Sequence, residues 1–264
     1  MSDLINIIQS KIISKIFLDY DMSKSTWFRT GGRASAYTVI NNIKDLKTIL
    51  SFKKKINYYI IGVGSNLLIR DNGFDGLIIK LGKNFNKIKL KQNMLSVGAG
   101  VLDVNLAKFA QKNSIKNFEF YSGIPGTIGG AVKMNAGCYG SETSDILNRI
   151  LLINKLGELK YLDVKDLNLG YRSSKIDEKS IILKADFKLD YGSYDDIKFK
   201  NNEIKFKRKT SQPLDKKTSG STFKNPPGKF AAVLIEKSGC KGMVIGGASI
   251  SNLHSNFIIN NGNA

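Results

Sequence analysis

The feature that most constrains this chain is a glycine-rich segment at residues 121–140, which reads YSGIPGTIGGAVKMNAGCYG. Four of its glycines supply closely spaced backbone N–H groups that no side chain covers: Gly123, Gly126, Gly129 and Gly130. Such a segment can press against an anionic ligand and donate several main-chain hydrogen bonds to it. Pro125 fixes one φ angle in the middle of the turn. The pattern is typical of a loop that binds the pyrophosphate of a nucleotide cofactor, and equally of a tight crossing of two strands.

Two more glycine turns precede this segment. Residues 62–66 (GVGSN) directly follow the apolar run at 58–61, and a glycine, a hydroxyl and an amide at a strand end suit phosphate or ribose contacts. Arg29 supplies a guanidinium beside the glycine pair at 31–32. The chain contains neither a GxGxxG fingerprint after a strand nor a GxxxxGK[ST] string, which excludes a Rossmann dinucleotide unit and a P-loop. Three such turns favour a large, extended cofactor.

Composition excludes several other classes. The 264 residues carry a formal charge of +19, but the lysines are spread through the whole chain, so we expect a solvated surface and no nucleic-acid partner. Cys138 and Cys240 lie far apart without a CxxC string, so we expect no metal site and a reducing compartment. No apolar run reaches the roughly 18 residues of a membrane span, and the N-terminus suggests an amphipathic helix. We therefore expect a cytoplasmic protein without membrane insertion.

Hydrophobic periodicity separates three regions, at 1–79, 80–203 and 204–264. We expect helices at 4–17, 42–55, 102–113 and 229–237, and a basic helix from about 204. We expect strands at 36–40, 58–61, 77–80, 88–90, 95–97, 147–153, 159–162, 181–189, 243–245 and 257–259. This mixture predicts an α+β protein.

Five strings in fixed order carry a more specific resemblance: TWFRTGG at 26–32, GVGSN at 62–66, SGIPG at 122–126 continuing to MNAG at 134–137, GYRS at 170–173, and GSTFKNP at 220–226. From about residue 20 to its last residue the chain resembles the UDP-N-acetylenolpyruvoylglucosamine reductase (MurB) family. The resemblance implies a two-lobed FAD-binding domain of the vanillyl-alcohol-oxidase/PCMH type, formed by the first two regions, and a C-terminal α+β substrate-binding domain.

The resemblance also implies which residues hold the cofactor, a non-covalently bound FAD. These are Arg29, Gly62, Gly64, Ser65, Asn66, Ser122, Gly123, Pro125, Gly126, Thr127, Gly129, Gly130, Ala131, Asn135 and Gly137. His254 is the sole histidine and falls in the third region, so we expect it to be a packed residue rather than a flavin attachment point. We expect Cys138 to be a small buried residue.

The implied reaction reduces an enolpyruvyl ether of a UDP-sugar to a lactyl ether, with NADPH as hydride donor. Arg172 would bind the substrate carboxylate and stabilise its developing charge, because a guanidinium is a permanently charged, forked donor. Ser221 matches the family's proton donor to the carbanion-like carbon. Tyr171, Lys224 and Asn225 are the expected substrate-binding residues.

One family feature is not found. The family carries a late glutamate, in a Leu-Glu-x-Glu-Val-type segment, that joins the arginine and the serine in protonation. That segment does not occur before Ala264, and Glu178 and Glu236 do not match its context. We therefore expect an incomplete third domain. Two alternatives stay open at this point: a flavin-binding homologue with impaired turnover, and a flavin-dependent alcohol oxidase of the same fold.

Overall fold

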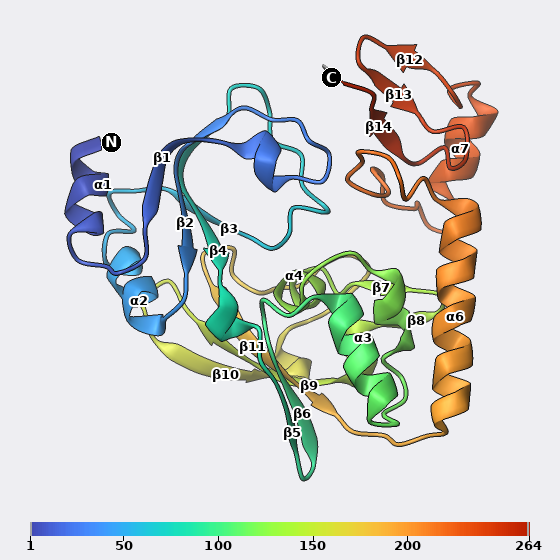
Figure 1. Ribbon diagram of the computed structural model, residues 1–264, viewed down its shortest axis with the longest axis horizontal. Coiled ribbons are helices and arrows are strands. Elements are labelled where there is room, and N and C mark those ends of the chain that lie inside the picture. The colour runs from blue at the N-terminus through green and yellow to red at the C-terminus, as the bar shows by residue number, and fades with distance from the viewer. Residues whose placement is uncertain (1, 263) are drawn as a thin grey trace. The chain divides into compact units, whose positions relative to one another are not determined.

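The N-terminal strands form a four-stranded sheet with the order β1-β2-β4-β3 (Figure 1). The computed structural model describes residues 2–262 and 264. The elements of this part are α1 (Ser2–Gln9), β1 (Ile16–Asp21), η1 (Met22–Ser25), β2 (Arg33–Ile40), α2 (Ile43–Ser51), β3 (Tyr58–Ile61) and β4 (Phe74–Leu81). Strands β3 and β4 are parallel, with Tyr58 opposite Leu77. The carboxyl end of β3 therefore delivers Gly62 to one edge of this sheet.

A five-stranded antiparallel sheet follows, with the order β10-β9-β11-β6-β5. Its strands are β5 (Ile88–Lys91), β6 (Met94–Gly98), β9 (Leu147–Ile153), β10 (Leu159–Asp163) and β11 (Ile181–Lys188). Between β6 and β9 lie α3 (Asp103–Lys112), η3 (Glu119–Gly123), α4 (Ile128–Lys133), the short pair β7 (Gly137–Cys138) and β8 (Ser141–Glu142), and α5 (Thr143–Ile146). Two further 3-10 turns are η2 (Lys83–Phe85) and η4 (Val164–Asp166).

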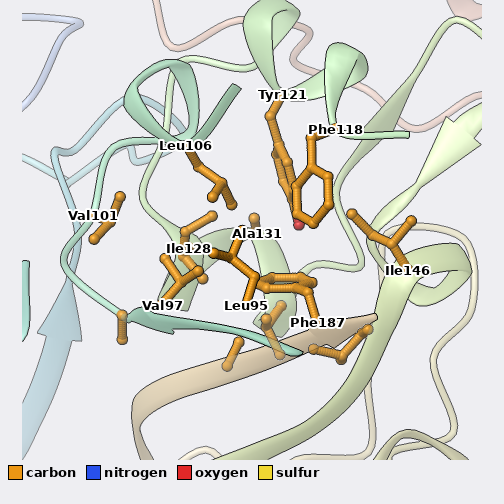
Figure 2. Packing of buried hydrophobic residues seen from close by; sticks show 14 of the residues in the cluster. Leu95, Val97, Val101, Leu106, Phe118, Tyr121, Ile128, Ala131, Ile146 and Phe187 are labelled. Carbon is orange, nitrogen blue, oxygen red and sulfur yellow. The ribbon is translucent and has the colours of Figure 1, made fainter. Parts of the chain in front are cut away.

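The core of this second sheet is built partly from the glycine-rich segment itself. Ile128 and Ala131 of α4 point into a cluster of buried side chains that includes Leu95 of β6 and Phe187 of β11 (Figure 2). Tyr121 is fully buried in the same cluster. Burial of side chains of this size contributes roughly 1.5–3 kcal/mol each. The loop that carries the candidate site is therefore fixed to the sheet by its own apolar residues.

The C-terminal elements are α6 (Tyr194–Ser211), α7 (Ala231–Lys237) and a three-stranded antiparallel sheet of β12 (Val244–Ile245), β13 (Ala248–Ile250) and β14 (Ile258–Asn260). None of the helices within the described part of the chain is both long and apolar enough to cross a membrane.

The chain divides into two compact units, and each is assembled from separated stretches. The first comprises the chain up to Tyr20, Ala34–Gly62 and Asp75–Ile204. The second comprises Asp21–Arg33, Val63–Phe74 and the chain from Lys205 onward. The division of the sequence into regions at 79/80 and 203/204 stays a prediction.

Most expected elements are present, and the N-terminal helix is the main error. The sequence predicted a helix at 4–17, but α1 ends at Gln9 and residue 16 begins β1. The side chain of Gln9 folds back, since its Oε1 accepts from the N–H of Ile16 at 2.7 Å and its Nε2 donates to the carbonyl of Ser14 at 3.2 Å. The carboxylate of Asp45 also accepts from the N–H of Ser14 at 2.8 Å. These tertiary bonds replace the helical ones. The basic helix also begins earlier than predicted, at Tyr194.

Candidate functional site

The glycine segment, defined here as residues 122–137, is held against the chain that follows β6. The N–H of Gly129 donates to the carbonyl of Ala99 at 2.8 Å, and the N–H of Ile128 donates to the carbonyl of Val101 at 2.9 Å. Two residues beyond Val101, the N–H of Asp103 donates to the carbonyl of Gly126 at 3.1 Å. This short antiparallel ladder fixes the loop and uses the N–H groups of Ile128 and Gly129, so the Gly129 amide, expected to face a ligand, is bonded within the protein.

The turn after β3 meets the glycine segment. A Cβ atom added to Gly62 would lie 2.6 Å from the hydroxyl oxygen of Thr127, far inside a normal contact. Thr127 itself is 7% exposed and precedes the first turn of α4. Two of the turns that the sequence assigned to the cofactor therefore touch within the first unit, although 65 positions separate them.

The glycines of the segment serve two purposes. A side chain on Gly126 would press against the carboxyl of Asp103 at 2.6 Å, and one on Gly129 would press against Cβ of Ala99 at 3.1 Å. These two glycines allow a close crossing of two backbone segments, which was one of the two interpretations of the sequence pattern. Gly130 differs, because it is exposed and its added Cβ would meet nothing nearer than the Thr127 hydroxyl at 3.7 Å. Gly130 leaves its part of the loop open to a ligand.

Asp103 was not identified from the sequence. Its side chain is fully buried, and neither carboxyl oxygen has a hydrogen-bond partner among the described residues. Burial raises the pKa of Asp103 well above its ordinary value and so favours the neutral form of the carboxyl. A carboxyl whose neutral form is favoured is compatible with a neighbouring loop that would bind an anion.

Arg172 lies at the end of the glycine segment. Its Nη2 donates to the carbonyl of Gly137 at 2.9 Å, and its guanidinium carbon lies 5.8 Å from the ring centroid of Tyr171. The residue has a φ of 52°, which a bulky side chain rarely adopts, at the tip of a tight turn closed by mutual bonds of 3.1 Å between Gly170 and Ser173. A non-glycine residue in this region costs on the order of 1–3 kcal/mol and is typical of functional sites.

Asn135 links these two features. Its Nδ2 donates to the carbonyl of Gly170 at 3.3 Å, and its Oδ1 accepts from the N–H of Ser144 at 2.9 Å. The side chain thus joins the glycine segment to the turn that carries Arg172. The prediction that Asn135 binds the cofactor stays a prediction, and the structure shows an additional role for it within the protein. Ala131 points into the core, so only its main chain can face a ligand.

The remaining residues of this loop are more accessible. Pro125 and Ser122 are half-buried, although the Ser122 Oγ atom is buried without a described hydrogen-bond partner. Gly123 is packed tightly, because an added Cβ would lie 3.0 Å from the sulfur of Cys138. Cys138 was expected to be a small buried residue; it is half-buried against the core cluster, and its thiol donates to the carbonyl of Phe120 at 3.2 Å.

The second unit holds the Arg29 turn and residues 64–66. Gly64 has a φ of 69°, and an added Cβ would lie 2.0 Å from the carbonyl oxygen of Ser25, so only glycine fits there. The N–H of Trp27 donates to the carbonyl of Gly64 at 3.0 Å. Arg29 has a φ of 56°, and its Nη1 donates to the carbonyl of Lys24 at 3.1 Å. The Arg29 turn therefore lies against Gly64, with Ser65 half-buried and Asn66 exposed beside it.

Ser221 is placed by Asn256, another residue that the sequence analysis missed. Ser221 is exposed and forms an isolated antiparallel β-bridge with Phe257. The N–H of Thr222 donates to the carbonyl of Asn256 at 2.8 Å. The amide side chain of Asn256 closes two more bonds, accepting from the N–H of Phe223 at 2.9 Å and donating to its carbonyl at 2.8 Å. This pairing fixes the backbone that follows the exposed Ser221.

The other residues singled out in the third region differ in exposure and in their contacts. Lys224 is exposed, whereas Asn225 accepts from the N–H of Ala231 through its Oδ1 at 3.0 Å, at the start of α7. The prediction that His254 is packed is confirmed. Its ring lies edge-on to Phe257 with centroids 4.7 Å apart, and burial lowers the pKa of the imidazole. No group of His, Cys, Asp or Glu side chains among residues 2–262 and 264 is arranged to hold a metal ion.

Comparisons with known proteins agree with this arrangement. A family model for an FAD-binding domain matches residues 34–163, and the C-terminal-domain model of UDP-N-acetylenolpyruvoylglucosamine reductase matches residues 212–264. The reductase of Rickettsia conorii is 46% identical over 247 residues, covering 93% of this chain and 84% of its own. That of Rickettsia typhi is 47% identical with the same coverage. The chain belongs to the UDP-N-acetylenolpyruvoylglucosamine reductase family. It is an oxidoreductase of this kind and contains an FAD-binding domain.

Solved structures support the same family and its fold. The reductase of Thermus caldophilus superposes with a TM-score of 0.85 at 33% identity, covering 95% of this chain and 89% of that one. The 6-hydroxy-D-nicotine oxidase of Arthrobacter nicotinovorans superposes with a TM-score of 0.52 at 18% identity over 68% of this chain and 43% of its own. The second likeness concerns the fold alone. The expected α+β fold with a flavoprotein-type domain is confirmed.

The donors of the first unit fit the diphosphate of FAD. They are the main-chain amides of Gly62 and Gly130, which no side chain covers, and the hydroxyl of Thr127, and burial of the nearby Asp103 carboxyl favours its neutral form by raising its pKa. Arg172 adds a fixed positive charge at the far end of the glycine segment.

Proposed function

We propose that the chain uses NADPH to reduce the enolpyruvyl ether of UDP-N-acetylglucosamine enolpyruvate, forming UDP-N-acetylmuramate for peptidoglycan synthesis. Bound FAD would supply the chemistry of accepting a hydride from NADPH and delivering it to the substrate double bond. NADPH and the UDP-sugar would use the same pocket in turn, and both are cytoplasmic metabolites. The observation that carries the proposal is the Arg172 guanidinium, anchored on Gly137 at the end of a glycine segment that suits an anionic cofactor.

Arg172 would bind the substrate carboxylate. Hydride addition to the terminal carbon places charge on the carbon beside that carboxylate, and a guanidinium already held in place needs no reorganisation to stabilise it. The 2.9 Å bond to Gly137 uses one of the five N–H donors of the guanidinium. The remaining donors have no hydrogen-bond partner among the described residues and can bind a carboxylate. A preorganised donor of this kind is worth about 3–4 kcal/mol in the transition state.

Ser221 would donate the proton that completes the reduction. Its hydroxyl is a weak acid, but an enolate-like carbon is basic enough to accept a proton from it. Gly220 has a φ of 83° with no atom near its added Cβ, and the pairing of Thr222 and Phe223 with Asn256 holds the following backbone. Tyr171, Lys224 and Asn225 would contact the sugar nucleotide, with Lys224 a point charge for its diphosphate.

The two half-reactions can be separated in one experiment. NADPH is added anaerobically to the purified yellow protein, and the enolpyruvyl UDP-sugar follows. We expect the visible flavin band to bleach with NADPH and to recover with the UDP-sugar. Bleaching without recovery would indicate the alternative of a flavin-binding homologue with impaired turnover, and an inert flavin band would contradict the proposed donor.

Ser221→Ala tests the proton donor. We expect NADPH to bleach the flavin of this variant at the wild-type rate, while recovery with the UDP-sugar slows by about 10²–10⁴-fold, the usual contribution of a general acid. Ser219→Ala, two positions away, is the matched control and should recover normally. Normal recovery in Ser221→Ala would remove the serine from the mechanism.

A further inference from the structure

A hollow in the first unit is lined by lysines, and none of its lining residues belongs to the glycine segment. It encloses about 450 Å³. Its lining comes from the chain between α2 and the first residue of β3, from the turn between β9 and β10, and from one residue shortly before β11. The lining residues are Lys53, Lys54, Lys55, Ile56, Asn57, Tyr58, Lys155 and Lys179. Five of these eight side chains are cationic and none is acidic.

Several of the amines are held in place around the hollow. The ammonium of Lys179 donates to Oδ1 of Asn57 at 2.9 Å and to the carbonyl of Tyr58 at 3.3 Å. The ammonium of Lys53 donates to the carbonyl of Lys155, which joins the two walls. Lys54 is exposed and makes no described side-chain contact. The site thus combines ammonium groups that are bonded within the protein with exposed ones that are not.

Negative charge beside the hollow is small. Asp177 lies 3.4 Å from the ammonium of Lys155, and the N–H of Lys179, 2.7 Å away, lowers the pKa of Asp177, so it is ionised. Glu158 bonds to Asn154 at 2.9 Å and to Lys160 at 3.5 Å, and the charge of Lys53 also helps to lower its pKa. Five ammonium groups therefore have two carboxylates near them, Asp177 and Glu158, and the remaining excess of positive charge concentrates the field in the hollow.

Helix capping explains only part of this cluster. Lys53, Lys54 and Lys55 follow the C-terminus of α2, where cations stabilise the helix dipole. Lys155 and Lys179 lie about a hundred or more positions further along the chain and have no such role. Their convergence on the same hollow points to a ligand.

We propose that this lysine-lined hollow binds the phosphate chain of a compact polyphosphate anion, such as a di- or triphosphate. Its volume lies within the range of small-molecule pockets, roughly 300–1,000 Å³. Lysine binds phosphate as a point charge, and separated amines suit several phosphates in a row. The aromatic residue of the site, Tyr58, is 3% exposed and donates its hydroxyl to the carbonyl of Lys179 at 2.7 Å. It offers no face on which a base can stack, so the phosphates are the recognised group.

The hollow lies at the other end of the strand that carries the cofactor turn. Strand β3 starts at Tyr58 and ends one residue before Gly62. Four residue steps of an extended strand cover about 13 Å. A polyphosphate bound at Tyr58 would therefore occupy a site separate from Gly62 while contacting the same strand.

Isothermal titration calorimetry of the FAD-loaded full chain tests the proposal, in buffer with physiological salt. The two titrants are inorganic tripolyphosphate and ATP, so that a free polyphosphate and a nucleotide are compared. We expect a single site with affinities for the two that agree within about threefold, because the phosphate chain is shared. Absence of binding for tripolyphosphate would overturn the proposal.

The double variant Lys54→Gln/Lys55→Gln should weaken tripolyphosphate binding by about tenfold, as expected for two partly screened charges. Both residues lie outside the cofactor and substrate contacts, so the flavin absorbance of the purified variant should be unchanged. Lys205→Gln/Lys209→Gln removes the same charge from exposed positions of α6 and should bind like the wild type. Equal weakening in the two double variants would show general charge attraction only and would overturn the proposal.

Discussion

The contact between Gly62 and Thr127 can be tested by introducing one methyl group. In Gly62→Ala the new Cβ would lie 2.6 Å from the Thr127 hydroxyl and 3.4 Å from its Cγ2. Gly62 does not have a positive φ, so the cost is steric and not conformational. An overlap of this size in a packed site costs about 1–3 kcal/mol.

Thr127→Ala should relieve that overlap. By itself it removes a methyl group and a hydroxyl from a residue that is 7% exposed, which costs roughly 1 kcal/mol. Independent effects would add in the double variant. If the new methyl occupies the space vacated by Thr127, the double variant should be no less stable than Thr127→Ala alone. The coupling free energy would then offset the whole steric cost, about 1–3 kcal/mol.

Urea unfolding followed by circular dichroism measures the four free energies, and reconstitution of the FAD-free protein measures cofactor affinity in the same variants. Gly130→Ala is the control, because its added Cβ has no neighbour closer than 3.7 Å. It should leave the stability within about 0.5 kcal/mol of the wild type or raise it, while weakening FAD binding at the exposed loop. Additive costs for Gly62→Ala and Thr127→Ala, within about 0.5 kcal/mol, would refute the contact.

Two further variants test groups that the sequence did not reveal. Burial raises the folded-state pKa of Asp103 above that of an unfolded carboxyl, so between these two values only the folded state keeps the proton and stability falls as pH rises. Between the two pKa values the free energy of unfolding of the wild type should fall by about 1.4 kcal/mol per pH unit. Asp103→Asn cannot lose this proton and should not show that fall. Urea unfolding of both proteins from about pH 4 upward measures the difference. Parallel pH profiles would contradict the neutral carboxyl. Asn256→Ala removes two hydrogen bonds to Phe223 and should cost about 2 kcal/mol by thermal unfolding, with slower flavin recovery because Ser221 loses its support. An unchanged melting temperature would contradict that role.

Local patterns in the sequence predicted the elements whose stability is decided nearby. The apolar run at 58–61 is strand β3, and the periodic stretch at 102–113 contains α3. The prediction failed where distant groups compete with local ones, as at α1, where Gln9 and Asp45 hold residues 13–16 out of the helix. Isoleucine spacing alone could not reveal a hydrogen bond to a residue 31 positions away.

The sequence by itself determined the chemistry available to this protein: glycine turns that expose amides, an arginine in a GYRS turn, and a serine beside Gly220, in the order that its family shares. Tertiary structure decided which of these groups meet. It placed Gly62 against Thr127, bonded Arg172 to Gly137, buried the carboxyl of Asp103, and gathered five lysines from three segments around one hollow. The physical reason is that such contacts depend on burial and hydrogen bonding between groups far apart in the chain, whereas turns and strands follow from the conformational preferences of neighbouring residues.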